Sequence, residues 1–504
     1  MASLQLQAVA AVLALVAGAG AAHGFEFHEA TVEAIQLGFS NGTLTSTALV
    51  RFYLDQIGRL NPLLHAVIEV NPDALRQAKH ADAERRRGTA TGSLHGVPVL
   101  LKDNIATRDA LNTTAGSLAL LGSVVKRDAG VVARLRRAGA VVLGKASLSE
   151  WANFRPVDDG WSARGGQARN PYVLSSTPCG SSAGSGVAAA ANMAAVTLGT
   201  ETDGSILCPS SFNSVVGIKP TLGLTSRAGV VPITPLQDTV GPMCRTVSDA
   251  VHVLDTIVGY DEHDAAATGA ASKYIPHGGY AQFLKKDGLR GKRIGVPNGF
   301  FQRYGQTQLN VYKQHLATMR ELGAVVVEKL DVAANLSALL DEIGSKEAIA
   351  MQAEFKLSIN AYLADLVYSP VHSLADIIAF NNQHPVERLK DFGQPDLIAA
   401  QSTNGIGPVE RAAIRRLKEL NANGLEKLMM EHQLDAIVAP NSDISSLLAI
   451  SGHPGIVVPA GYDEKGFPFG ICFGGLQGYE PRLIEMAYAF EQATKVRRPP
   501  MFKP

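Results

Sequence analysis

The chain has 504 residues, of which 46% are hydrophobic and 18% charged, so it carries enough apolar side chains to bury a large folded core. Its 46 Lys and Arg residues balance its 46 Asp and Glu residues. This balance excludes a global attraction to nucleic acid or to an anionic membrane surface, and we expect a small or neutral molecule as the partner.

The chain begins with a segment that has the features of a secretory signal peptide. Residues 1–22 carry no charged side chain and contain an apolar run at 8–16 that is followed by small residues. The run is too short and too rich in Ala and Gly to span a bilayer, and an ordinary Ala-rich helix is the alternative. We predict a signal peptide at 1–24, a mature chain at 25–504 and a secreted or secretory-pathway protein. Three sequons are compatible with glycosylation on that route: Asn41, Asn112 and Asn335.

The next part of the chain alternates between helical and strand-like patterns. Apolar residues recur at helical spacing over 45–60, which predicts an amphipathic helix. The apolar run 96–101 predicts a buried strand with Lys102 at its end, and a second strand at 140–143 follows a helix at 129–138. This alternation favours an α/β sheet.

Residues 259–432 have a different character, with longer polar helices such as 338–366 and 409–432 and few strand signals. We predict a more variable helical region here, beside the sheet. After it the chain returns to short β-like runs, and a final helix is predicted at 481–495. No repeat or low-complexity linker divides the sequence, so one interleaved domain is the simplest interpretation.

The four cysteines, Cys179, Cys208, Cys244 and Cys472, show no C-x-x-C pairing and no His at metal-ligand spacing. We therefore predict no metal site. A chain of this size does not need a disulfide even if it is secreted, and free cysteines are commonly buried. We expect buried thiols, with one bridge as the alternative.

A glycine- and serine-rich stretch at 178–186 is not a phosphate loop, because the Lys-Ser/Thr ending of that motif is missing. Residues 180–184 match G-x-S-x-G, the nucleophile elbow of α/β-hydrolases, with Ser182 at the centre. An elbow requires a strand that runs into the turn, and the residues before this one form a poor strand. An α/β-hydrolase esterase that uses Ser182 with His453, and Asp443 as the acid, is kept as an alternative.

A second tight turn carries Ser205. After an Ala-rich helix predicted at 187–195, the apolar run 195–198 leads into the stretch 199–209, in which Ser205 follows Gly204. Small residues allow backbone N–H groups to converge on one point, as the stabilisation of a tetrahedral oxyanion requires. Taken alone, this turn fits an ordinary loop equally well.

Three segments in this order closely resemble the amidase signature family: residues 96–104, the glycine- and serine-rich stretch, and residues 200–209. The resemblance runs through nearly the whole mature chain and is weakest in the helical middle. It implies the amidase signature fold, a single large α/β domain with a mixed central β-sheet covered by helices on both faces. It also implies a Ser-Ser-Lys triad of Lys102, Ser181 and Ser205, with a cis peptide bond before the middle serine.

In such a triad, Ser205 is the nucleophile and loses its proton to an amine, which must be uncharged to accept it. The pKa of Lys102 must then fall from about 10.4 towards roughly 7 or 8, and burial behind an apolar strand has this effect. Ser181 would carry the proton between Lys102 and Ser205 and return it to the leaving amine. For an isolated lysine, the ordinary alternative is a surface side chain paired with Asp103.

The resemblance also assigns residues around the nucleophile. The backbone N–H groups of Thr202, Asp203, Gly204 and Ser205 would form the oxyanion hole. Many relatives have a second Gly where Asp203 stands, so the role of the Asp203 carboxylate stays open. Trp151, Phe154 and Ser182 are candidates for the substrate pocket, although packing in the core is the commoner role of buried aromatic side chains.

The stretch that carries Ser205, together with residues 165–171 and 380–394, is similar to the peptide amidase branch, whose members remove the C-terminal amide of peptides and release ammonia. We predict hydrolysis of carboxylic amide bonds through a serine acyl-enzyme, without a cofactor, on C-terminal peptide amides or similar small amides. The alternatives are a fatty-acid or aryl amide hydrolase of the same family, a subunit of a tRNA-dependent amidotransferase, the esterase described above, and a non-catalytic binding protein on the same scaffold. We expect a monomer or a homodimer, no nucleic-acid partner and no membrane span.

Overall fold

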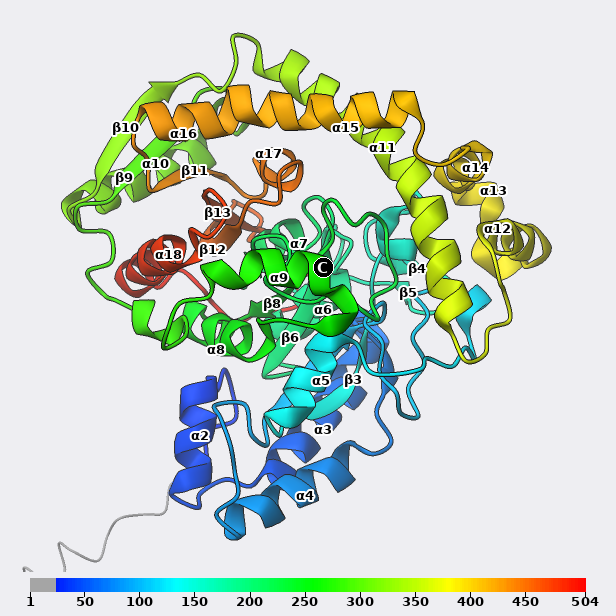
Figure 1. Ribbon diagram of the computed structural model, residues 1–504. Helices are drawn as coiled ribbons and strands as arrows, with labels where there is room; N and C mark the ends of the chain where they lie inside the picture. The colour runs from blue at the N-terminus through cyan, green and yellow to red at the C-terminus, as the bar shows by residue number, and fades with distance from the viewer. Residues whose placement is uncertain (1–23) are drawn as a thin grey trace, which may run out of the picture.

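The computed structural model describes residues 24–504, and its centre is a mixed β-sheet of 11 strands (Figure 1). The strand order is β1-β3-β2-β6-β8-β7-β12-β13-β11-β9-β10. The neighbours β3, β2 and β6 run parallel, as do β11, β9 and β10, and the remaining pairs are antiparallel. The predicted signal peptide up to residue 23 lies outside the described residues and stays a prediction.

The strands of this sheet are β1 (Val67–Val70), β2 (Pro98–Lys102), β3 (Val141–Ala146), β6 (Val196–Glu201), β7 (Val216–Lys219), β8 (Thr239–Cys244), β9 (Arg293–Pro297), β10 (Val325–Leu330), β11 (Ala436–Pro440), β12 (Gly455–Tyr462) and β13 (Pro468–Gly474). A separate ribbon pairs β4 (Trp161–Ser162) with β5 (Gly166–Gln167). The α-helices up to the end of the middle region are α2 (Val32–Ser40), α3 (Ser46–Leu64), α4 (Ala74–Arg86), α5 (Gly130–Arg137), α6 (Ala183–Ala190), α7 (Leu207–Phe212), α8 (Val247–Ile257), α9 (Ala265–Ala271), α10 (Gln306–Glu321), α11 (Leu336–Asp365), α12 (Leu374–Gln383), α13 (Leu389–Phe392), α14 (Pro395–Ser402), α15 (Pro408–Asn421) and α16 (Lys427–Glu431). The last two helices are α17 (Ser445–Ala449) and α18 (Glu480–Thr494), and two short helical turns used below are η2 (Glu150–Asn153) and η7 (Pro385–Glu387).

Alternate residues of the central strands face opposite layers of helices. In β12, Ile456 and Val458 belong to an apolar cluster that includes α8 and α18. Val457 between them belongs to a second cluster, with Leu207 of α7 and with residues of α17. Because successive side chains of a strand point to opposite faces, helices cover both sides of the sheet. This confirms the predicted single α/β domain with a mixed, doubly covered sheet.

The helix predicted at 45–60 is α3, and it extends past the predicted end to Leu64. Thr45 caps its first turn by accepting a hydrogen bond from the Ala48 N–H. Pro62 lies inside the last turn, where a proline costs about 3 kcal/mol. Burial of Leu60 and Leu64 is worth about 3–6 kcal/mol, so the apolar contacts keep these residues in the helix.

Two further boundaries differ from the predictions. The helix expected at 187–195 is α6, which begins at Ala183 with Ser182 as its N-cap residue. Its first turn consists of small residues because the helix approaches another backbone closely: a Cβ at Gly184 would lie 2.4 Å from the Ala66 carbonyl. The helical region at 259–432 contributes only two strands of the described chain, β9 and β10, which the sequence did not single out. Strand β10 is largely exposed at the edge of the sheet, where a short strand with charged side chains gives a weak apolar pattern.

Helices α11, α12 and α14 stand at the right of Figure 1. They pack on the rest of the domain through a third apolar cluster. Phe355 of α11 stacks on Phe154, with ring centroids 3.9 Å apart. Trp151 belongs to the same cluster and is 2% exposed. The helical middle is therefore packed on the loop that follows η2.

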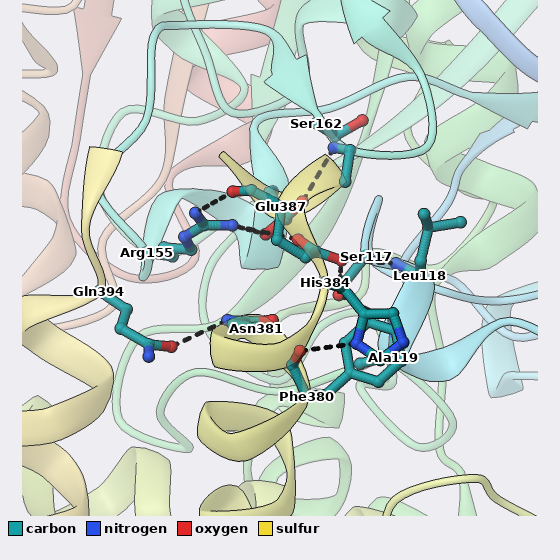
Figure 2. A network of polar contacts seen from close by, with 12 residues as sticks. Ser117, Leu118, Ala119, Arg155, Ser162, Phe380, Asn381, His384, Glu387 and Gln394 are labelled. Atoms are coloured by element: carbon teal, nitrogen blue, oxygen red, sulfur yellow. Dashed lines mark hydrogen bonds and ion pairs between the residues drawn. The ribbon is translucent and has the colours of Figure 1, made fainter. Parts of the chain in front are cut away.

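A buried polar network lies beside this cluster (Figure 2). The Arg155 side chain is completely buried and contacts the carboxylates of Glu150 (2.5 Å) and of Glu387 in η7 (3.1 Å). Its Nε also donates to the Gly393 carbonyl (2.9 Å), and Glu387 accepts from the Leu118 N–H (3.2 Å). One cation thus joins the segment around η7 to the core of the domain.

Along residues 24–504, no helix combines the length and the apolar character that crossing a membrane would require. In the same residues, no three His, Cys, Asp or Glu side chains gather in a group that could hold a metal ion.

Candidate active site

Lys102 ends the central strand β2 and is completely buried. Its Nζ donates to Ser181 Oγ (2.8 Å), to Thr200 Oγ1 (2.9 Å) and to the Thr200 carbonyl (3.0 Å). Burial lowers the pKa of Lys102 to about 7, although the nearby carboxylates of Glu201 and Asp238 oppose the effect. A lysine with this pKa is partly uncharged at neutral pH, as a general base must be.

The alternative role of Lys102 as a surface partner of Asp103 is wrong. Asp103 is itself buried, and its carboxylate accepts hydrogen bonds from the Thr114 hydroxyl and from the Gly116 N–H (3.1 Å). The two neighbouring residues therefore point to different environments, as successive residues of an extended chain do.

Ser181 lies in the turn between Cys179 and helix α6, and the peptide bond between Gly180 and Ser181 is cis, as the family resemblance implied. The neighbouring Ser182 is completely buried, and its hydroxyl donates to the Thr200 carbonyl (3.0 Å). Ser182 thus ties this turn to the end of β6, whereas Ser181 faces the lysine.

Ser205 stands in the turn between β6 and α7 and is 8% exposed. Gly204 has a φ of 77°, a conformation that favours glycine, and the Ser205 carbonyl accepts from the Ser182 N–H (3.2 Å). Within residues 24–504, none of the N–H groups of Thr202, Asp203, Gly204 and Ser205 donates to a protein acceptor. These groups are therefore available to a substrate oxygen, and their oxyanion role stays a prediction, as does the relay from Ser205 to Ser181.

The expectation of free thiols was wrong for two of the four cysteines. Cys179 and Cys208 form a disulfide with Cα atoms 5.9 Å apart, whereas Cys244 and Cys472 are buried and free. The expectation rested on chain size and could not include the approach of two segments in space. Cys179 belongs to the turn that carries Ser181 and Cys208 to α7, the helix that follows Ser205, so the bridge joins the Ser181 turn to the start of α7.

Replacing both bridged cysteines, as Cys179→Ser with Cys208→Ser, is expected to lower the free energy of unfolding by about 3 kcal/mol, because the crosslink spans a sequence separation of 29 residues and restricts the unfolded chain. Denaturant unfolding of the oxidised protein and of the double variant measures the difference. Wild-type protein kept in a reducing agent is the control and should match the variant. Equal stability of all three samples would show that the bridge does not stabilise the fold.

The other predicted site residues have contacts of their own. Asp203 accepts a hydrogen bond from the Ser446 hydroxyl (2.6 Å), which ties the turn that carries Ser205 to α17. Trp151 and Phe154 are 2% and 9% exposed and pack in the third apolar cluster. Whether they also line the substrate pocket stays a prediction.

The esterase alternative required Ser182, His453 and Asp443 to meet, and the structure contradicts it. The His453 ring contacts Asn421 (2.9 Å) and Glu426 (3.2 Å). Asp443 accepts from the Tyr304 hydroxyl (2.9 Å), and Ser182 bonds to Thr200 as described above. The three side chains thus have separate partners, and Ser182 is buried at the start of α6 instead of standing on an exposed elbow.

Sequence reasoning missed three residues around the lysine. Thr200 accepts from Lys102 through two oxygens, and Asn104 Nδ2 donates to the same Thr200 hydroxyl (2.9 Å). Glu201 accepts from two N–H groups at the start of α7. Their position was the signal that could have identified them. Asn104 follows the end of β2, which carries Lys102, and Thr200 and Glu201 end β6, which leads to Ser205.

Comparisons with known proteins place this site in a family. The model of the family described as Amidase matches residues 48–449. A probable amidase of Arabidopsis thaliana is 58% identical over 95% of this chain and 92% of its own length, and a glutamyl-tRNA(Gln) amidotransferase subunit from Thermoanaerobacter pseudethanolicus is 30% identical over 94% and 98%. The solved structure of native peptide amidase from Stenotrophomonas maltophilia has a TM-score of 0.89 at 45% identity and covers 95% of this chain and 100% of that one.

The fold and the site define an α/β enzyme in which a buried lysine lies beside two serine-bearing turns at the end of parallel strands. The chain belongs to the amidase signature family. It is an amidase, an enzyme that hydrolyses carboxylic amide bonds, and its structure resembles that of a peptide amidase over nearly the whole described chain.

Proposed function

We propose that this amidase works through a serine acyl-enzyme in which Ser205 is the nucleophile, Ser181 the proton relay and Lys102 the base. The observation that carries the proposal is the contact of 2.8 Å between Lys102 Nζ and Ser181 Oγ, made by a fully buried lysine. Burial brings the pKa of Lys102 to about 7, so the amine can take a proton at neutral pH.

The proposed reaction has two stages. Uncharged Lys102 takes the Ser181 proton while Ser181 takes that of Ser205, and Ser205 Oγ forms a bond to the amide carbon. The backbone N–H groups of 202–205 stabilise the resulting oxyanion. The proton then returns through Ser181 to the leaving nitrogen, and the carbon–nitrogen bond breaks. Water repeats the sequence on the acyl-enzyme and releases the acid.

We propose C-terminal peptide amides, or similar small amides, as the substrates. The support is the 45% identity to the peptide amidase of Stenotrophomonas maltophilia and the similarity of the segments at 165–171 and 380–394 to that branch. A fatty-acid or aryl amide hydrolase of the same family is the second candidate, because the triad chemistry is the same for any acyl group. The likeness to the amidotransferase relative is lower, at 30% identity.

A panel of amides tests the substrate class. The protein is incubated with C-terminal peptide amides, long-chain acyl amides and aryl amides, and the release of ammonia or amine is followed by mass spectrometry, with Ser205→Ala as the inactive control. We expect the highest kcat/KM for peptide amides. Turnover of long-chain acyl amides without turnover of any peptide amide would overturn the substrate class and leave the triad in place.

We also propose that the chain enters the secretory pathway. The uncharged apolar segment at 1–22 supports this, and so does the disulfide, because disulfides persist in oxidising compartments. The sequon residues Asn41 and Asn335 are exposed, whereas the Asn112 side chain is partly buried. N-terminal sequencing and intact mass of the protein purified from whole cells and medium of a secretory host test the proposal, and protein that stays in the cells with an intact Met1 would contradict it.

A further inference from the structure

We propose that Glu201 is a positioning residue of the active site, whose carboxylate holds the turn that carries Ser205 and whose negative charge faces Lys102. The inference rests on the proposed triad, since it concerns the groups that hold the nucleophile and the base in place. Glu201 would not contact the reacting atoms and would act through its neighbours.

The first argument is the geometry of the turn. Glu201 is the last residue of β6 and is 1% exposed. Its Oε2 accepts hydrogen bonds from the N–H groups of Ile206 (2.6 Å) and Leu207 (2.9 Å). One side chain therefore closes the loop from the end of the strand to the start of the helix, and the enclosed residues are 202–205, which carry the nucleophile and the candidate oxyanion donors.

The second argument is that helix α7 lacks a side-chain cap at its N-terminus. Its N-cap residue is Ile206, which has no side-chain oxygen to accept from the first N–H groups of the helix. These groups need acceptors and carry partial positive charge, so an anionic carboxylate suits them better than a neutral group. Glu201 takes the place of the missing cap, and the start of α7 is fixed directly after Ser205.

The third argument concerns charge. Glu201 follows Thr200, whose two oxygens accept from Lys102, and its negative charge favours the protonated form of that lysine. Asp238 is the second carboxylate that acts on Lys102. Without these charges, burial would lower the pKa of Lys102 further.

Burial raises the pKa of Glu201 above its ordinary value, and a neighbouring cation and the two N–H groups of α7 oppose this rise. Lys219 at the end of β7 is completely buried, and its charge opposes the rise that burial causes in the pKa of Glu201. Asp203 in the turn acts in the opposite direction, and Lys219 also faces Glu480 of α18 and Cys472 of β13. In the described chain, Glu201 Oε1 is buried without a hydrogen-bond partner, as is Oε2 of Glu480.

Two variants separate the two roles. Glu201→Gln keeps the length of the side chain and removes the charge, whereas Glu201→Asp keeps the charge and shortens the reach to Ile206 and Leu207. In Glu201→Gln, Lys102 loses a neighbouring anion, its pKa falls, and the amine stays uncharged at lower pH. The acidic limb of kcat/KM should then move by about 0.5–1 unit to lower pH. In Glu201→Asp, the limb should stay in place while kcat falls about 10- to 100-fold at little change in KM, because the nucleophile turn is displaced.

Glu480→Gln is the matched control. Glu480 is also completely buried, faces Lys219 and accepts a backbone hydrogen bond, from the Thr221 N–H (2.6 Å), but it is not among the charges that act on Lys102. This variant should leave the pH limb and kcat near their wild-type values even if it lowers stability. All profiles use one peptide amide that the wild-type protein turns over, or else the best amide of the panel.

The outcomes distinguish the two levels of the proposal. Activity retained by Ser205→Ala would overturn the triad itself, whatever the Glu201 variants do. If Ser205→Ala is inactive but Glu201→Gln leaves the limb in place, or Glu480→Gln moves it equally, the charge role of Glu201 is wrong. Wild-type kcat in Glu201→Asp would remove the positioning role. If Glu201→Gln does not fold, the test uses Glu201→Asp and measures the rate at which a fluorophosphonate labels Ser205 as a function of pH. A lower labelling rate with an unchanged acidic limb supports the inference. A wild-type labelling rate contradicts it.

Discussion

Lys102→Met is expected to lower kcat by about 10³-fold while the protein stays folded. Methionine has a similar length and suits a buried site, but it has no nitrogen to accept the Ser181 proton. The substitution removes three donated hydrogen bonds, one to Ser181 and two to Thr200. Steady-state kinetics at saturating amide measure the change in kcat, and thermal unfolding shows whether the fold survives.

The assignment of Lys102 as the base also predicts in which direction the activity of the wild-type enzyme changes with pH. The active form is the uncharged amine, which predominates above the pKa of Lys102, so kcat/KM should rise as pH increases through about 7. The residual activity of Lys102→Met should lack this limb. A limb near pH 7 that persists in the variant would assign the titration to another group and remove Lys102 from the role of base.

Lys145→Met is a matched control for this experiment. Lys145 lies on the adjacent strand β3, directly opposite Leu101, and is also completely buried. Burial lowers the pKa of Lys145 to about 8, yet its Nζ donates to the Ile105 carbonyl (2.6 Å) and to Thr113 Oγ1 (2.9 Å) instead of to a serine turn. Its replacement should lower stability while kcat stays within about tenfold of wild type, because it removes a buried donor and no base.

Arg155→Met is expected to lower the free energy of unfolding by about 3–5 kcal/mol, because it leaves two buried carboxylates without their cation. Glu150 and Glu387 both contact this guanidinium, and all three side chains are completely buried. Burial, followed by the charge of Glu387, raises the pKa of Glu150 to about 8 even with Arg155 present. The loss in the variant should therefore be largest above pH 8, where Glu150 is ionised, and should shrink as pH falls below about 8, since a protonated carboxyl needs no counter-charge.

Urea unfolding at two pH values measures this effect, and hydrogen exchange shows where it acts. We expect faster exchange in residues 374–402, which this network joins to the core (Figure 2). Arg388→Met is the control: Arg388 pairs with Asp391 at 2.7 Å in an exposed position, and such pairs contribute about 0.2–1 kcal/mol. Equal losses in the two variants would show that the buried network is not what holds this segment.

The chemistry of the candidate site was predictable because it depends on residues that the chain places in short segments. Lys102 ends a run of apolar residues, and such a run forms a buried strand in almost any fold. Ser181 and Ser205 each stand among small residues, which allow a close approach of backbones. Local patterns of this kind survive folding with little dependence on the rest of the chain.

Features that join distant segments were not predictable in the same way. The disulfide between Cys179 and Cys208 depends on the approach of the two serine turns. Strand β10 was missed because it is an edge strand whose three valines are followed at once by Glu328 and Lys329, and β9, which lies buried between β11 and β10, was missed because it is only five residues long. The burial of Arg155 was not predictable either. Arginine is seldom completely buried without a partner, so an arginine in a sequence is ordinarily assigned to the surface.

The sequence by itself determined the family, the reaction class and the three residues proposed to carry the reaction, because their types and order along the chain are sufficient for the family resemblance. Only the tertiary structure decided which side chains hold those residues. It placed Thr200 on Lys102, closed the Ser205 turn with the Glu201 carboxylate, and separated His453 from Ser182. Each of these is a contact between side chains whose direction depends on how strands and helices pack, and a hydrogen bond is lost when that packing shifts by about 1 Å.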